Sequence, residues 1–383
     1  MYGQVITLIK RLLLLFLVVF MMPITVFVNA AGVDVSAQAS ILMEQKTGTI
    51  VYEKNAHKRM RMASTTKIMT GLIAVESAKL DTPVVMTDAM VRVEGTSMGL
   101  KAGDIVTVEG LLYGLLLQSG NDAANALAIH IAGSAKKFAE RMNQKAAQIG
   151  MKESSFVTPS GLDNDAHYTT AYDMALLTCY AMNNPKFAEI VSSVKKTIQF
   201  VSPNEKRTYY NHNRLLKECD GVEGVKTGFT KKSGRCLVTS CKRNDIRLIA
   251  VTLNAPSDWN DHKMLYNFGF PLFEQQEIDC GIEKNIKVTG GKKKKVSVYS
   301  ENTYLPNRIG IELKIEKKLV LPKFIYAPVK NGDVVGYQQI MINGKEVARV
   351  PVYAGESIEK KEIKRESFLQ KLAYNFLELL SFN

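Results

Sequence analysis

Hydrophobic and polar positions follow three successive patterns along the chain. The stretch "ASILMEQKTGTIVYEKN" (39–55) predicts two short strands joined at the turn Lys46-Thr47-Gly48. Helical periodicity follows from about 63 to 190, in segments that are apolar on most faces and are therefore expected to be buried. The predicted helices are Lys67–Ser77, Val108–Leu117, Asp122–Ile131, Ser134–Ala147 and Thr170–Met182.

Strand patterns return after the helical region. We expect strands at Gly224–Phe229, Arg235–Cys241 and Ile246–Leu253, followed by a closing helix over 261–273. Strands first, helices inserted and strands last predict an α/β domain, in which an antiparallel sheet is flanked by helices and carries a helical insertion.

From about Ile278 the period changes to two, which predicts a small all-β domain. Asn331-Gly332 and Asn343-Gly344 are typical hairpin turns. The run Lys292–Lys295 is either a binding patch or, as we favour, a solvated turn or protected edge strand. The apolar residues expected to face this domain's core include Ile309, Ile311, Leu313 and Ile315.

Both ends of the chain differ from these domains. Lys10 and Arg11 precede an apolar run that ends in Val28-Asn29-Ala30, which predicts a signal peptide cleaved after about Ala30; an uncleaved anchor is the alternative. The expected segments are therefore 1–30 (signal), 31–275 (α/β domain), 276–357 (β-rich domain) and 358–383 (terminal helix).

The terminal segment is predicted to form a helix with one apolar face, and a cluster of basic residues, called here the basic approach, precedes that face. Such a helix either docks on the protein or lies in a membrane interface, and it is too short and too charged to span a bilayer. The basic residues favour an anionic membrane surface. The apolar face is formed by Phe368, Leu369, Leu372, Phe376, Leu377 and Leu380, and the approach contains Lys360, Lys361, Lys364 and Arg365.

Charge and cysteine content narrow the classes of partner. The 383 residues carry a formal net charge of +13, and +11 remains when Lys10 and Arg11 are removed with the signal. A basic exported protein suits an anionic polymer or membrane surface, whereas export argues against nucleic acid. Five cysteines without a CxxC pattern fit unpaired thiols, although some pairing stays open. The five histidines show no close metal-ligand spacing, which argues against a zinc peptidase.

Ser64 and Lys67, in "RMASTTKIMTGL", are the first candidates for chemistry. A spacing of three puts both side chains on one face of a helix. A buried lysine with a lowered pKa could take the serine proton and make the serine a nucleophile. The alternative is a helix-capping serine beside a surface lysine.

Two further motifs follow in order. Ser119-Gly120-Asn121 lies between two apolar helices, and it offers a hydroxyl for proton transfer and an amide that could bind a peptide carbonyl. The alternative is that these residues only end one helix and begin the next. Lys226-Thr227-Gly228 lies on a predicted strand, where Gly228 would let a substrate backbone approach closely, or it marks a strand end.

Together the three motifs resemble the β-lactamase and penicillin-binding protein superfamily. The Ser-Gly-Asn form is similar to the low-molecular-weight D-alanyl-D-alanine carboxypeptidases, particularly those of spore-forming Gram-positive bacteria. The resemblance extends to "SGLDNDAHYTTAYDMALL" and to "YAPVKNGDVVG" in the β-rich domain. It implies an exported enzyme, peripheral on the outer face of the membrane, that cleaves the D-Ala-D-Ala end of peptidoglycan stem peptides.

The resemblance also assigns roles. Ser64 would be the nucleophile acylated by substrate or by β-lactams, and Lys67 its general base. The N–H groups of Ser64 and Phe229 would form the oxyanion hole. Ser119, with Lys226, would assist proton transfer to the leaving D-alanine, Asn121 would orient the acyl part, and Thr227 with Lys226 would bind the terminal carboxylate. It implies no metal or organic cofactor.

One feature departs from the pattern. Many relatives carry an arginine soon after the strand that ends here near Leu253, but "LNAPSDWNDHK" contains none. Two other functions stay open: a β-lactamase, although the helical region lacks an E-x-x-L-N-type loop, and a non-catalytic penicillin-sensing or wall-binding protein. His167 is expected to shape the helical insertion without a catalytic role.

Overall fold

The computed structural model describes residues 33–362. The expected signal segment and the apolar face of the terminal helix lie outside the described residues, so both stay predictions. Within 33–362, no helix is long and apolar enough to cross a membrane.

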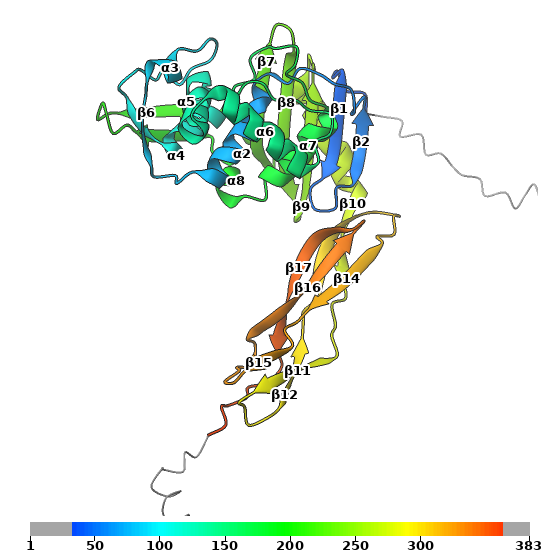
Figure 1. The fold of residues 1–383 in the computed structure, drawn as a ribbon. Helices are drawn as coiled ribbons and strands as arrows, with labels where there is room; N and C mark the ends of the chain where they lie inside the picture. The colour runs from blue at the N-terminus through cyan, green and yellow to red at the C-terminus, as the bar shows by residue number, and fades with distance from the viewer. Residues whose placement is uncertain (1–32, 363–383) are drawn as a thin grey trace, which may run out of the picture. The chain divides into compact units, whose positions relative to one another are not determined.

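A five-stranded antiparallel sheet forms the centre of the first domain (Figure 1). The central strand β9 and its neighbour β1 are almost wholly buried because helices cover both faces. Alternate residues of β1 face opposite layers: Ile41 and Met43 join the helical core, whereas Leu42 contacts Gly269 on the other face. In sheet order the strands are β2 (Ile50–Lys54), β1 (Ala39–Glu44), β9 (Ile246–Leu253), β8 (Gly234–Arg243) and β7 (Val222–Thr230).

The helical layer packs around α2, whose first eight residues, Lys67 to Ala74, are all buried. α2 contacts α4, α5 and α7, and α7 in turn covers β1 and β9 (Figure 1). The five predicted helices are confirmed to within about two residues at each end. The main helices are α2 (Lys67–Ser77), α4 (Val108–Leu116), α5 (Asn121–Ala132), α6 (Ala135–Ile149), α7 (Ala171–Ala181) and α8 (Pro185–Ser192).

Several short elements carry too few residues to show a period. The expected closing helix is also shifted, because α10 spans Asp258–Gly269 and Pro271 ends it in the short helix η2 (Phe270–Leu272). The first turn of α10 was not predicted because its residues are mostly polar and show no apolar period. The short elements are β3 (Pro83–Val85), α3 (Asp88–Val91), β4 (Ile105–Thr107), β5 (Lys195–Gln199), β6 (Lys206–Tyr210) and α9 (Leu215–Glu218).

The second domain is all β, as predicted. A two-stranded sheet pairs β10 with β13, and a six-stranded sheet has the order β14-β16-β17-β12-β11-β15. Two clusters, centred on Val296 and Ile340, form its core. The strands are β10 (Phe273–Ile278), β11 (Lys284–Thr289), β12 (Lys295–Tyr299), β13 (Thr303–Arg308), β14 (Ile315–Val320), β15 (Phe324–Tyr326), β16 (Val334–Ile342) and β17 (Lys345–Ala354).

Two expectations about this domain are wrong. Ile309 and Ile311 do not face its core: they are 55% and 52% exposed, because Gly310 turns the chain with a φ of +80° and interrupts the alternation before β14. Leu313 and Ile315 do pack, partly buried, against the core. Asn331-Gly332 is a turn but not a hairpin, since β15 pairs in parallel with β11 instead of with β16.

Other expectations about loops and thiols are confirmed. Asn343-Gly344 joins the antiparallel pair β16 and β17. The lysine run forms the exposed turn before β12, where Lys292 and Lys293 pair with Glu359 and Glu356. All five cysteines are unpaired thiols.

Candidate active site

Ser64 and Lys67 meet at the start of the central helix. Ser64 lies in the short helix η1 (Ala63–Thr66), and Lys67 begins α2. The ammonium Nζ of Lys67 donates to Ser64 Oγ at 2.9 Å, to Asn121 Oδ1 at 2.7 Å and to the Ser160 carbonyl at 2.7 Å. Lys67 is fully buried, and this burial, reinforced by repulsion from Lys226, lowers its pKa well below the usual value. A neutral Lys67 can therefore accept the Ser64 proton.

The chain enters η1 through a strained residue. Ala63 has a φ of +47°, a conformation rare for a residue with a side chain. Thr66 Oγ1 donates to the Ala63 carbonyl at 2.8 Å. Gly161 packs so closely that a Cβ there would come 1.9 Å from the same oxygen. These contacts hold the backbone before Ser64 in one geometry.

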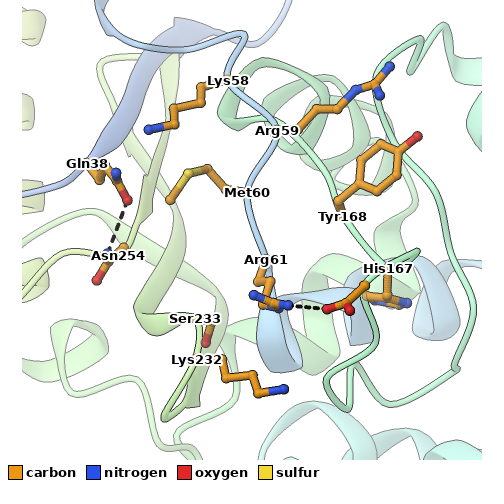
Figure 2. Close-up of a pocket in the computed structure, with 11 residues that line it drawn as sticks. Gln38, Lys58, Arg59, Met60, Arg61, His167, Tyr168, Lys232, Ser233 and Asn254 are labelled. Carbon is orange, nitrogen blue, oxygen red and sulfur yellow. Dashed lines mark hydrogen bonds and ion pairs between the residues drawn. The ribbon is translucent and has the colours of Figure 1, made fainter.

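His167 supports this entry from the neighbouring loop (Figure 2). Its Nδ1 accepts the Val157 N–H at 2.9 Å, so Nε2 carries the proton and donates to Thr66 Oγ1 at 2.8 Å. Burial lowers the pKa of His167 to about 4, which keeps the ring neutral. His167 thus positions the segment that carries Ser64.

The second motif lies at the start of α5. Ser119 has a φ of +63° and lines the cavity beside Ser64. Asn121 holds Lys67 through Oδ1, and its Nδ2 donates to the Glu94 carbonyl at 2.5 Å. The amide that the sequence suggested for the substrate is thus engaged with the protein, so in this structure Asn121 positions the lysine.

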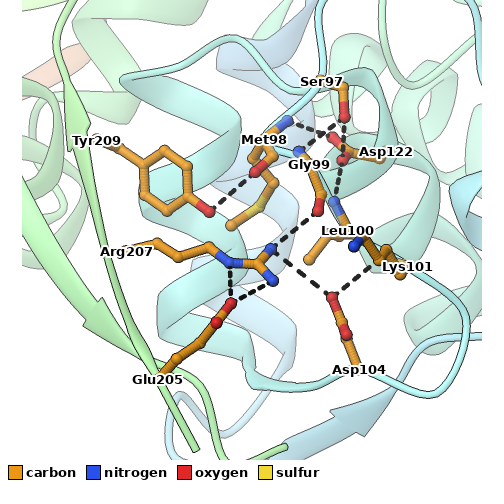
Figure 3. A network of polar contacts seen from close by, with 10 residues as sticks. All are labelled: Ser97, Met98, Gly99, Leu100, Lys101, Asp104, Asp122, Glu205, Arg207 and Tyr209. Atoms are coloured by element: carbon orange, nitrogen blue, oxygen red, sulfur yellow. Dashed lines mark hydrogen bonds and ion pairs between the residues drawn. The ribbon is translucent and has the colours of Figure 1, made fainter. Parts of the chain in front are cut away.

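A polar network fixes the loop that covers this motif (Figure 3). The Asp122 carboxylate accepts from the backbone N–H groups of Met98 and Leu100 at 2.9 and 3.0 Å. Arg207 of β6 donates to the Gly99 carbonyl at 2.8 Å, and Tyr209 donates to the Met98 carbonyl at 2.9 Å. The loop is therefore tied on one side to α5 and on the other to β6.

The third motif lies on β7, at the edge of the sheet. Lys226 is 1% exposed, its Nζ donates to the Thr227 carbonyl at 2.9 Å, and burial lowers its pKa to about 7. A Cβ on Gly228 would come 3.0 Å from Ser64 N and 3.1 Å from Thr65 N. The missing side chain thus lets β7 approach the backbone of Ser64, where the sequence had suggested close approach of a substrate.

The three motifs converge on one cavity of about 310 Å³. Lys67, Asn121 and Lys226 lie buried behind it, and Ser64 is at its wall. Its lining is Ser64, Thr96, Ser119, His212, Thr227, Gly228, Phe229, Arg235, Asp258 and Trp259.

Arg235 is a cationic residue of this cavity that the sequence did not single out. The antiparallel register places it opposite Phe229, so its side chain shares a sheet face with Phe229 and Thr227. Its Nε and Nη2 both lie 3.0 Å from Asp258 Oδ1, and its guanidinium is 5.6 Å from the centre of the Trp259 ring. Both strands of this hairpin were predicted from the sequence, and pairing them would have placed Arg235 beside Phe229. His212, one of the five histidines, also lines the cavity.

Comparisons with known proteins agree with this geometry. The family model of the D-alanyl-D-alanine carboxypeptidases matches residues 25–257, and the model for the C-terminal domain of penicillin-binding protein 5 matches 272–360. The D-alanyl-D-alanine carboxypeptidase DacF of Bacillus subtilis (strain 168) is 33% identical over 340 residues, which cover 85% of this chain and 86% of that protein.

Two solved structures share the fold. Penicillin-binding protein 5 from Haemophilus influenzae aligns with a TM-score of 0.62 at 28% identity, covering 86% of this chain and 99% of that one. The peptidoglycan synthesis regulatory factor PBP3 from Streptococcus pneumoniae aligns with a TM-score of 0.68 at 27% identity, covering 85% and 100%.

The fold and the Ser-x-x-Lys site define a serine peptidase of the penicillin-binding class. The chain belongs to the D-alanyl-D-alanine carboxypeptidase family, peptidase family S11, whose members act on peptidoglycan stem peptides and bind β-lactams. The expected fold class, an antiparallel sheet flanked by helices with an added β domain, is confirmed.

Proposed function

We propose that the protein removes the terminal D-alanine from peptidoglycan stem pentapeptides through an acyl-enzyme on Ser64. The observation that carries this proposal is the 2.9 Å contact between Ser64 Oγ and Lys67 Nζ, in which a fully buried lysine with a lowered pKa faces a serine at the wall of a cavity.

In the proposed acylation, Ser64 Oγ attacks the carbonyl between the two D-alanines and its proton passes to Lys67 Nζ. The N–H groups of Ser64 and Phe229 stabilise the oxyanion, an arrangement supported by the close approach of Gly228 to Ser64 N. The C–N bond then breaks, and the departing amine takes a proton by way of Ser119. Water later cleaves the Ser64 ester and restores the hydroxyl.

The terminal carboxylate of the substrate needs a cation. Arg235 supplies this cation on the sheet face that carries Thr227. The segment after Leu253, where many relatives carry an arginine, has none in this chain. Asp258 and Trp259 fix the guanidinium while its side chain stays 42% exposed toward the cavity. We therefore assign the carboxylate to Thr227, Lys226 and Arg235 together, since a guanidinium can bind a carboxylate through two N–H groups.

The test is release of D-alanine by the full chain. Incubation with a defined pentapeptide muropeptide should remove one D-alanine, seen as the mass loss in mass spectrometry. Ser64→Ala should abolish release, whereas the matched variant Ser77→Ala on α2 should keep it. Penicillin labelling without release would instead favour a sensor, and rapid turnover of nitrocefin would favour a β-lactamase.

The proposed location is the outer face of the cell membrane, reached by export with segment 1–30 and held by segment 358–383. The apolar face and basic approach of the terminal segment support this location. Truncation after Glu359 should move the signal-cleaved enzyme from the membrane fraction to the soluble fraction without loss of hydrolysis. Persistent membrane association of the truncated form would contradict the anchor.

A further inference from the structure

A second cavity, of about 570 Å³, lies at the ends of the central strands (Figure 2). Three segments that are distant in sequence form most of its wall: residues 58–61, which lead into η1; part of the 165–168 loop; and Lys232-Ser233 in the β7–β8 turn. Gln38 and Asn254, which bond to each other at 3.2 Å, complete it. Residues of this cavity were not among the sequence candidates for substrate binding.

The wall is strongly cationic. Lys58, Arg59, Arg61 and Lys232 line it, against the single carboxylate of Asp165. His167 also lines it, but its pKa of about 4 keeps it neutral at physiological pH. The wall therefore presents an excess of positive charge to whatever enters.

Two of the four cations, both arginines, pair with carboxylates of the described chain. Arg59 pairs with Glu153 and stacks over Tyr168, with 4.8 Å from its guanidinium to the ring centre. Arg61 pairs with Asp165, although its Nε is buried without a hydrogen-bond partner among residues 33–362.

The two lysines differ from the arginines. Lys58 and Lys232 are exposed, and no carboxylate of the described part of the chain pairs with either of them. Two unpaired ammonium groups and two guanidinium groups around one cavity fit an anionic ligand, because a carboxylate accepts hydrogen bonds from such cations.

This cavity adjoins the catalytic one. Only three peptide units separate Arg61 from Ser64, so their Cα atoms lie within about 11 Å. On the other side, Ser233 Oγ accepts the N–H of Thr230 at 3.0 Å, and Thr230 follows Phe229 directly.

The direction of the substrate leads to this cavity. If the terminal carboxylate lies at Thr227 and the scissile carbonyl at the N–H of Phe229, the chain runs along β7 toward its turn. The peptide upstream of the cleaved bond then extends toward Lys232 and residues 58–61.

We propose that this cationic cavity is a substrate subsite, which binds a carboxylate of the stem peptide upstream of the scissile bond. The inference rests on the proposed function. The peptide chemistry that fits is a γ-linked D-glutamate, which leaves a free α-carboxylate two residues before the penultimate D-alanine. A wall phosphate polymer has similar charge, and the experiment separates the two sources.

The experiment compares two pentapeptides with the full-length enzyme. They differ only at the second residue, γ-D-glutamate in one and γ-D-isoglutamine in the other, so they differ by one negative charge. We expect the acidic peptide to have about fivefold higher kcat/KM, the size that one or two partly exposed ion pairs can supply. The ratio should shrink in 0.5 M NaCl.

Variants assign the preference to the cavity. Lys58→Gln combined with Lys232→Gln should bring the acid-to-amide ratio close to one. The matched pair Lys136→Gln and Lys137→Gln on α6 removes the same charge from exposed positions elsewhere and should keep the ratio. Hydrolysis of the amide peptide reports in the same assay that each variant is folded.

The outcomes are separable. Equal kcat/KM for both peptides in the wild type would overturn the subsite while leaving the carboxypeptidase intact. Retardation of poly(glycerol phosphate) by wild type but not by the double lysine variant, with equal kcat/KM, would assign the cavity to phosphate and likewise overturn it. No release of D-alanine from either peptide would overturn the proposed function itself.

Discussion

The same residue type occupies two opposite environments on either side of Ser64. Lys67 and Lys226 are buried behind the catalytic cavity, at 0% and 1% exposure, whereas Lys58 and Lys232 stand exposed around the neighbouring one. Burial lowers the pKa of both inner lysines. The lowered pKa values allow the inner pair to exchange protons, and the exposed position of the outer pair suits it to attract an anion.

The two inner lysines themselves differ in their partners. Lys67 Nζ has three oxygen acceptors, including Ser64 Oγ, which fix its position. Within residues 33–362, Lys226 Nζ donates to one acceptor, the Thr227 carbonyl, which leaves donors for a ligand. This difference supports a base at Lys67 and a carboxylate-binding cation at Lys226.

The largest expected effect comes from removing the inner cation. Lys226→Gln should lower kcat/KM for pentapeptide about 10- to 100-fold at pH 6, the cost of a hydrogen bond to a charged group in a buried site. The measurement is kcat/KM across pH 4.5 to 9.

The shape of that pH profile follows from the two pKa directions. Below its lowered pKa, Lys67 is protonated and cannot accept the Ser64 proton, so activity falls as pH decreases. Above about 7, Lys226 is neutral and loses its attraction for carboxylate, so activity also falls as pH rises.

Lys226→Gln should change both limbs of this curve. The alkaline limb should disappear, and the acid limb should move to higher pH because the charge that depresses the Lys67 pKa is gone. An unchanged alkaline limb in this variant would contradict the assignment. Arg235→Gln is the control, since it removes a different cation from the same cavity and should keep both limbs.

The parts of this picture that sequence predicted are those set by local pattern. The helices around α2 and the bounds of β9 follow from apolar runs that no solvated segment would carry. Ser64 and Lys67 were found because a helix brings residues three apart together without help from the rest of the fold.

What the sequence missed depends on pairing between segments. Arg235 reaches the cavity only because β8 pairs with β7 in a register that sets it opposite Phe229. The proximity of Gly228 to Ser64 N and the bond from Asn121 to Lys67 likewise join separate elements. In the second domain, one glycine, Gly310, was enough to turn two expected core isoleucines outward.

Arg235 is intermediate between the buried lysines of the catalytic cavity and the exposed lysines of the neighbouring one. Its guanidinium is fixed by the buried Asp258, yet 42% of its side chain is exposed toward the cavity, so it should act through substrate affinity without any proton transfer. Arg235→Gln should raise KM for the pentapeptide about tenfold, at the lower end of the range for a charged hydrogen bond, with little change in kcat.

The form of the substrate tests this role. A peptide whose terminal carboxylate is replaced by an amide should be hydrolysed equally slowly by wild type and by Arg235→Gln, because the group that Arg235 binds is absent. Arg235→Lys should recover only part of the affinity, since a lysine lacks the fork that Asp258 holds in place. A lowered kcat with unchanged KM in Arg235→Gln would instead place this arginine in the support of Ser64, and the carboxylate would then rest on Lys226 and Thr227.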